Sequence, residues 1–174
     1  GFYVNGLDKS KFATIYEYQP DAGKYVVSPN AYNPRTTEFE AYQMGYSTPI
    51  FSPTGGMKIS AKDLATYMMM HANYGKYNGA RIISKKSSKL MQTAVSDIEP
   101  YGFALETPGS IIDGQKMIGH TGSAYGLFSA MFFNPKEKYG IVVISNGCHP
   151  GEASGYNNVI RKAVNALYEN LIAN

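Results

Sequence analysis

The sequence predicts an α+β fold in which an antiparallel sheet is covered by helices. Extended apolar segments after residue 100 are joined by links too short for a crossover helix, which favours antiparallel pairing. Segments 61–73 and 156–173 instead carry apolar residues at helical spacing. Residues 127–133 are apolar at all but one position, as expected of a strand whose two faces are both covered.

Length and composition are those of a folded globular chain. A chain of 174 residues fits one domain, and a domain of this size buries roughly 70% of its unfolded surface. Cys148 is the only cysteine, so no intrachain disulfide exists. The net charge of +3 is too small and too scattered along the sequence to predict binding to nucleic acid or to an anionic membrane. No apolar run reaches the roughly 20 residues of a membrane span.

The N-terminal segment, residues 1–50, is rich in Tyr, Pro, Asn and Gly and is expected to be mostly loop. Residues 12–18 and 24–28 are short extended candidates within it. The turn sequence Gln19-Pro20-Asp21-Ala22-Gly23 separates these two stretches.

Two helices are predicted between residues 57 and 92. Ser60 and Asp63 form a capping box at the start of the first helix, which continues to residue 73. The dipeptide Asn78-Gly79 then marks a tight turn. A shorter helix through Met91 follows, and its cap is either Ser84 or Ser87.

The second half is predicted to contain four strands followed by a helix. The strands are expected at residues 101–106, 116–121, 126–134 and 139–145. The helix at residues 156–173 presents an apolar stripe that can lie on the sheet, formed by Val159, Ile160, Ala163, Val164, Leu167 and Leu171.

The candidate site is the sequence His120-Thr121-Gly122-Ser123, at the end of the second predicted strand. It presents a ring, a hydroxyl and backbone amides along a strand edge, where an acyl substrate can pair with the backbone. The amide near Ser123 can stabilise an oxyanion, and Gly122 leaves room for close approach. A histidine near a strand end is also common as a structural residue, so the motif alone leaves both interpretations open.

Several short motifs occur in a fixed order along residues 50–170: SPTGGMKISAKDL at 52–64, NGARIIS at 78–84, YGF at 101–103, GHTGSAYG at 119–126, NP at 134–135 and SNG at 145–147. Together they resemble the C-terminal part of the penicillin-recognising serine hydrolases. This family includes class C β-lactamases, D-alanyl-D-alanine peptidases and related esterases.

The resemblance implies the C-terminal part of the β-lactamase/transpeptidase-like fold. Residues 51–174 would belong to its α/β domain, and residues 1–50 would be a loop-rich segment from the subdomain junction. The family's third active-site box is Lys-Thr-Gly or His-Thr-Gly, so His120 and Thr121 would line the substrate carboxylate site. The amide of Ser123 would be an oxyanion donor, whereas the Gly55-Gly56 loop would be structural. The parent protein would be periplasmic or exported.

The family's nucleophile lies in a Ser-x-x-Lys box, which this sequence lacks because no serine has a lysine three residues later. Tyr3-Val4-Asn5 matches the second box, Tyr-x-Asn, but no apolar helix follows it, so we interpret the match as coincidence. We therefore expect no catalytic residue here, and expect the C-terminal half of a longer protein that is inactive alone. The parent would hydrolyse a β-lactam, D-alanyl peptide or ester through an acyl-enzyme.

Two other functions remain open at this stage. A non-catalytic relative would bind peptidoglycan peptides or a protein through the same cleft. A metal or acid/base enzyme using His71, His120 and His149 is disfavoured because no pair has ligand spacing. We expect no cofactor and no metal.

The strand at residues 139–145 leads to an expectation about assembly. Family sheets place N-terminal strands beside the last strand, so its apolar edge would be unpaired in this sequence. We therefore expect a homodimer through the edge of Tyr139–Ser145.

Overall fold

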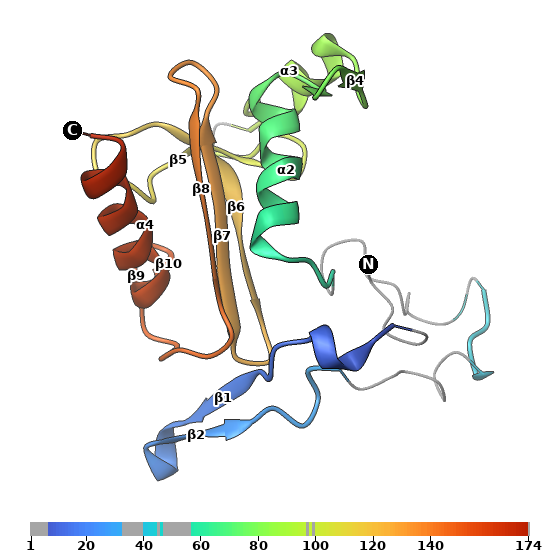
Figure 1. Ribbon diagram of the computed structural model, residues 1–174, viewed down its shortest axis with the longest axis vertical. Coiled ribbons are helices and arrows are strands. Elements are labelled where there is room, and N and C mark those ends of the chain that lie inside the picture. The colour runs from blue at the N-terminus through green and yellow to red at the C-terminus, as the bar shows by residue number, and fades with distance from the viewer. Residues whose placement is uncertain are drawn as a thin grey trace.

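The computed structural model describes residues 7–32, 40–44, 46, 57–96, 98 and 100–173. It confirms the α+β class, with a four-stranded antiparallel sheet between two helices (Figure 1). The strand order β5-β6-β7-β8 follows the chain, since short turns join successive strands. The four strands are β5 (Glu106–Gly109), β6 (Met117–Ala124), β7 (Leu127–Asn134) and β8 (Tyr139–Ser145).

The helices cover opposite faces of this sheet (Figure 1). Helix α2 (Ala61–Ala72) begins as predicted at Ser60, whose hydroxyl accepts a 3.1 Å hydrogen bond from the Asp63 amide. Helix α3 (Lys85–Met91) is capped by Ser84 rather than Ser87. Between these two helices, β3 (Lys76–Tyr77) and β4 (Ala80–Arg81) form a hairpin around the predicted Asn78-Gly79 turn.

The C-terminal helix α4 (Asn158–Leu171) is shorter than predicted at both ends. Its first two predicted residues form β10 (Tyr156–Asn157), which pairs with β9 (Glu152–Ala153). Asn157 also caps the helix, because its side-chain oxygen accepts hydrogen bonds from the amides of Val159 and Ile160.

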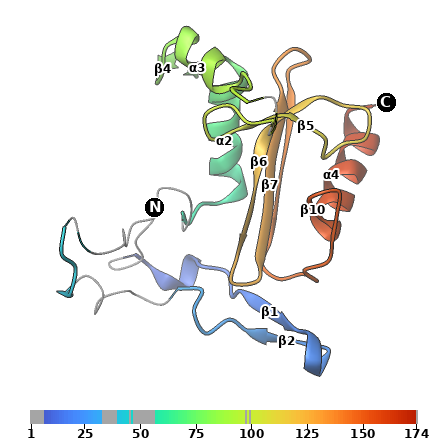
Figure 2. The ribbon, with the colours of Figure 1, turned by 180° about the vertical axis from the view of Figure 1, so that it is seen from behind.

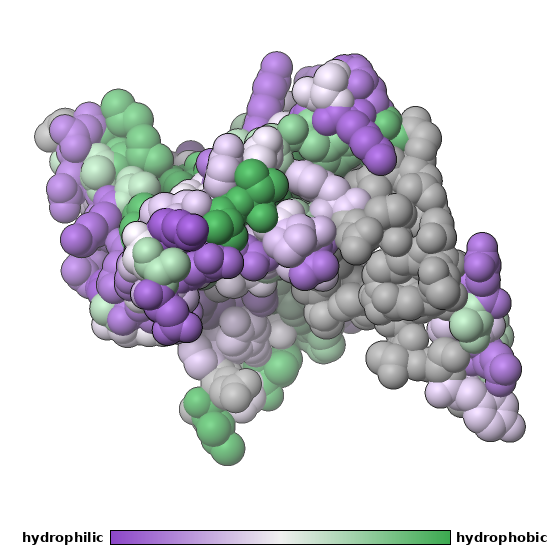
Figure 3. Space-filling model, turned by 90° about the horizontal axis from the view of Figure 1, so that it is seen from below, coloured by the Kyte–Doolittle hydropathy of each residue, from purple (hydrophilic) through white to green (hydrophobic). Residues whose placement is uncertain are grey.

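The N-terminal segment, which the sequence predicts to be mostly loop, contains two short helices and two strands among its described residues. After the short helix η1 (Lys9–Lys11), a hairpin forms from β1 (Tyr16–Gln19) and β2 (Lys24–Val27), and η2 (Pro20–Ala22) lies within its turn. The hairpin lies beneath the end of the sheet (Figure 2), where the Tyr16 amide donates a 2.8 Å hydrogen bond to the Asn146 carbonyl. Seen from below, hydrophobic residues form several separate patches among hydrophilic ones (Figure 3).

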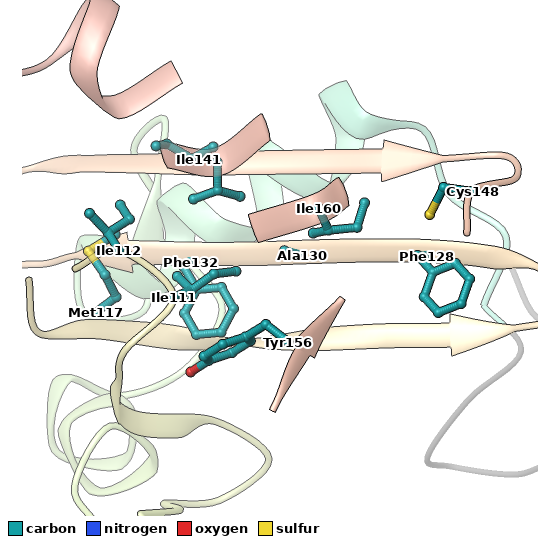
Figure 4. Close-up of a cluster of buried hydrophobic side chains, with 11 residues drawn as sticks. Ile111, Ile112, Met117, Phe128, Ala130, Phe132, Ile141, Cys148, Tyr156 and Ile160 are labelled. Atoms are coloured by element: carbon teal, nitrogen blue, oxygen red, sulfur yellow. The ribbon is translucent and has the colours of Figure 1, made fainter. Parts of the chain in front are cut away.

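The main hydrophobic core lies between the sheet and α4 (Figure 4). Phe132 of β7 is fully buried there, and its ring contacts Tyr156 edge to face. A second cluster fills the space between the sheet and α2, where Met131 and Phe133 meet Met68. Burial on both faces explains why β7 is apolar at nearly every position.

The predicted strand at residues 101–106 is wrong in its placement, since β5 begins only at Glu106. Tyr101 makes just an isolated bridge to Glu106. Between them the chain turns back on itself, because the Gly102 amide donates to the Leu105 carbonyl and Ala104 has φ of 59°. Gly102 also packs tightly against the Met91 carbonyl at the end of α3.

Candidate functional site

The four candidate residues lie together within β6. The sequence placed Ser123 beyond the strand end, but β6 continues to Ala124. A two-residue turn, Tyr125-Gly126, then leads into β7, and both residues have positive φ, 56° and 90°. β6 continues to Ala124 because its seven-pair register with β7 holds the whole motif in extended conformation.

Side chains alternate along β6 and therefore divide between the two faces of the sheet. His120 pairs with Met131, which packs in the cluster with α2. Thr121 pairs with Ala130, which packs in the cluster with α4. The motif thus places His120 and Gly122 on the α2 face, and Thr121 and Ser123 on the α4 face.

Among the described residues, the backbone edge of β6 is unpaired along the motif. β5 pairs with β6 only through Gly109 opposite Met117 and Glu106 opposite Gly119. Within the described part of the chain, no strand pairs with residues 120–124 on this side. An unpaired edge offers backbone donors and acceptors to an extended ligand. His120 and Thr121 flank that edge from opposite faces.

His120 is exposed. Its ring meets the Tyr101 ring edge to face, with 5.8 Å between the centroids. Its Nδ1 atom hydrogen-bonds the Thr121 carbonyl oxygen. Tyr101 belongs to the YGF motif, and that motif was the sequence signal that could have placed this residue in the site. The sequence alone did not predict its contact with His120.

Gly122 has a structural explanation within the sheet. A Cβ atom added there would lie 2.6 Å from the Ser129 hydroxyl on the neighbouring strand β7. The missing side chain therefore leaves room for Ser129, on the α2 face. The sequence predicts that this glycine lets a substrate or another backbone come close, and the structure adds that Ser129 of β7 occupies the space on the α2 face.

The three histidines lie apart in the fold. His71 is buried in α2, whereas His149 is exposed beyond β8, with its ring 4.7 Å from the Tyr18 ring. The Nδ1 atom of His149 accepts a hydrogen bond from the Gly151 amide. No group of three or more His, Cys, Asp or Glu residues among the described ones is arranged to hold a metal ion.

Cys148 carries the only thiol of the chain, and this thiol is not placed for nucleophilic chemistry. Cys148 is buried in the main core, and burial raises the pKa of its thiol. A raised pKa leaves less of the reactive thiolate at neutral pH. The Gly55-Gly56 loop and Tyr3-Val4-Asn5 lie outside the described residues.

No helix in the described ranges has both the length and the apolar composition needed to cross a bilayer.

Comparison with known proteins gives one match and one negative result. No curated protein matches the chain. The family model described as Beta-lactamase matches residues 3–166, which include the whole sheet and the β6 motif. The chain belongs to the Beta-lactamase family.

Proposed function

We propose that this chain supplies the substrate-binding edge of a serine hydrolase that acts through an acyl-enzyme. The observation that carries the proposal is the edge of β6 at residues 120–124, which no described strand pairs with on that side, with exposed His120 beside it. Membership of the Beta-lactamase family supports a hydrolase-like relative. We infer that the substrate is a β-lactam, a D-alanyl peptide or an ester.

The geometry suggests how this edge handles an acyl substrate. The substrate lies alongside β6 and pairs with its free backbone groups. The Ser123 amide donates to the carbonyl oxygen as negative charge develops there. His120 and Thr121 hold the substrate carboxylate from the two sides of the strand, so the reacting carbonyl stays in one position.

The attacking oxygen is not supplied by these 174 residues, because none of their serines starts a Ser-x-x-Lys box. Serine and lysine act as a unit, in which the lysine takes the proton as the serine oxygen attacks the carbonyl carbon. A binding edge without that pair has no route to the covalent step. We propose that the chain alone binds acyl ligands without cleaving them.

Replacing Thr121 with alanine tests the binding edge. We expect the wild-type chain to bind a fluorescent penicillin or a D-alanyl-D-alanine peptide saturably. Thr121→Ala should weaken this binding about tenfold, since a hydrogen bond to a charged group contributes about 1.5–3 kcal/mol. Fluorescence anisotropy measures the affinity. Thr93→Ala is the matched control, because Thr93 is an exposed threonine beyond the end of α3 that is not part of β6.

A denaturing gel of the penicillin-treated chain separates the two parts of the proposal. A covalent penicilloyl adduct would show that the nucleophile lies within these residues. Equal affinity of the Thr121→Ala and wild-type chains would contradict the assigned edge. The alternative, a non-catalytic relative that binds peptidoglycan peptides or a protein, is favoured if the encoding gene specifies neither Ser-x-x-Lys nor Tyr-x-Asn upstream.

We also propose that two copies of the chain associate through the edge of β8. Within the described residues, β8 pairs only with β7. Its outer side opens into a groove of about 710 Å³, which Val142, Val143 and Ile144 line together with Ala61 of α2 and with Ala163, Ala166, Leu167, Asn170 and Leu171 of α4. Among the described residues, no charged side chain lines this groove. An apolar edge without charges is a template for pairing with another strand. A two-fold axis that runs between two copies of β8 would join two such edges.

A charge at this edge should prevent the association. We expect the wild-type chain to form a dimer that dissociates on dilution, and Ile144→Lys to remain a monomer. Light scattering coupled to size-exclusion chromatography measures the mass. Ile82→Lys is the matched control because Ile82 is 68% exposed on the segment before α3. A wild-type chain that stays monomeric at every concentration would rule out this interface.

A further inference from the structure

One corner of the molecule gathers positive charge that the net charge conceals. Residues 64–96 include five basic residues and no acidic one. They lie on the β3–β4 hairpin and on α3, which project together at one end of the molecule (Figure 1). All five side chains are exposed: Lys76, Arg81, Lys85, Lys86 and Lys89.

Tyr74 shows how the fold brings these charges together. The Arg81 guanidinium donates a 3.0 Å hydrogen bond to the Tyr74 carbonyl. The Lys89 and Lys138 ammonium groups lie 5.6 and 5.3 Å from the centroid of its ring. Lys85 lies one helical turn before Lys89 on the same face of α3. We name these residues the basic corner: Lys76, Arg81, Lys85, Lys86, Lys89 and Lys138.

Helix stabilisation explains only part of this cluster. Lys138 donates a 3.0 Å hydrogen bond to the Ala72 carbonyl, and Arg81 donates to Tyr74 just beyond the same helix end. Cations at such positions favour the C-terminus of α2. The lysines of α3 make no such bond in the described structure, and no acidic side chain there pairs with any member of the corner. Like charges at i and i+4, as in Lys85 and Lys89, destabilise a helix.

Two exposed aliphatic side chains accompany the charges. Ile82, next to Arg81, is 68% exposed, and Leu90, next to Lys89, is 53% exposed. A nucleic acid would use the cations but would leave these aliphatic groups without a partner. An anionic bilayer matches both features, because its phosphates attract the cations and its headgroup boundary accepts apolar side chains.

We propose that the basic corner binds the surface of a membrane containing anionic phospholipids, with Ile82 and Leu90 inserted among the headgroups. The corner lies outside the β6 edge, so this inference stands independently of the proposed hydrolase function. It differs from the expectation drawn from the net charge, because the net charge of the whole chain does not reveal this local excess of positive charge.

Vesicle sedimentation tests the proposal with the full 174-residue chain. We expect binding to phosphatidylcholine vesicles only when they contain phosphatidylglycerol. Added salt should weaken the binding, because the Debye length falls from about 10 Å at 0.1 M to about 3 Å at 1 M. The triple variant Lys85→Gln, Lys86→Gln and Lys89→Gln should bind at least about tenfold more weakly, since each cation near an anionic surface contributes.

A matched triple variant controls for net charge. Lys9→Gln, Lys24→Gln and Lys162→Gln also removes three exposed charges, but from η1, β2 and α4. Its affinity should change by less than about twofold. Equal losses in the two triple variants would overturn the proposal, because only net charge would then matter. Circular dichroism confirms that the variants are folded.

The apolar contribution has its own variant. Ile82→Ser with Leu90→Ser should weaken vesicle binding severalfold while retaining every charge. Unchanged binding would overturn the insertion of these side chains. A labelled oligonucleotide distinguishes the other class of partner: binding to it through the α3 lysines, without binding to the vesicles, would identify a nucleic-acid surface and overturn the membrane proposal.

Discussion

Gly119→Ala, near the start of β6, is expected to destabilise the fold by about 3 kcal/mol, the upper end of the usual range for overpacked cores. A Cβ atom there would lie 2.0 Å from the Met131 carbonyl oxygen and 2.7 Å from the Phe132 Cα. Both neighbours are backbone atoms of β7, so they cannot yield without disrupting the β6–β7 pairing. Such a disruption would also displace the candidate site.

Urea denaturation measures this loss of stability. Gly114→Ala is the matched control, because a Cβ atom at Gly114 would meet no atom within 4 Å, although its φ is +76°. The control should lose only about 1–2 kcal/mol, the cost of placing an L-residue in the left-handed region. Equal stability of the two variants would contradict the close packing at Gly119.

Acid is expected to destabilise the protein through His71. This side chain is only 1% exposed, and within the described structure neither ring nitrogen has a hydrogen-bond partner. Its ring contacts Tyr67 edge to face at 4.7 Å and stacks near Phe133 at 6.4 Å. Of these two neighbours only Tyr67 is titratable, and burial raises its pKa, so it stays neutral near pH 7. Burial therefore lowers the pKa of His71.

The sign of the effect follows from proton linkage. Because the folded-state pKa lies below the unfolded value near 6.5, the unfolded chain binds the proton more readily. Stability is then fully present above the unfolded pKa and falls as the pH drops through 6.5 towards the folded pKa. The slope for a single group is at most about 1.4 kcal/mol per pH unit.

Urea midpoints measured from pH 7 to pH 5 test this expectation. His71→Phe should flatten the pH dependence, because phenylalanine keeps the aromatic packing but does not titrate. A wild-type slope that persists in His71→Phe would assign the acid sensitivity to another group.

Local sequence patterns were sufficient to predict most elements of the fold. Ser60 and Asp63 mark the start of α2 because a helix cap depends on residues within one turn. The four-strand order followed from short links and apolar runs. The late start of β5 was not predictable in this way. The turn before β5 packs Gly102 against the Met91 carbonyl at the end of α3, and a local sequence pattern does not report such a contact between separate elements.

The candidate site was predictable as a segment but not as a surface. The motif identified His120 to Ser123, yet their division between two faces depends on the register with β7. Tyr101 reaches His120 only through the folded loop after α3. The basic corner depends on the fold only for its sixth member, since Lys138 is far from Lys89 in sequence and meets it at Tyr74, whereas the other five members lie within residues 76–89.

The alternation of side chains along β6 makes this strand sensitive to length as well as to identity. Because the Tyr125-Gly126 turn fixes the pairing with β7, deleting one residue between Thr121 and this turn would reverse the orientation of every earlier side chain in the strand. The imidazole of His120 and the hydroxyl of Thr121 would then exchange faces of the sheet, even though both residues were retained. Homologous chains should therefore tolerate substitutions in this segment far better than single-residue insertions or deletions.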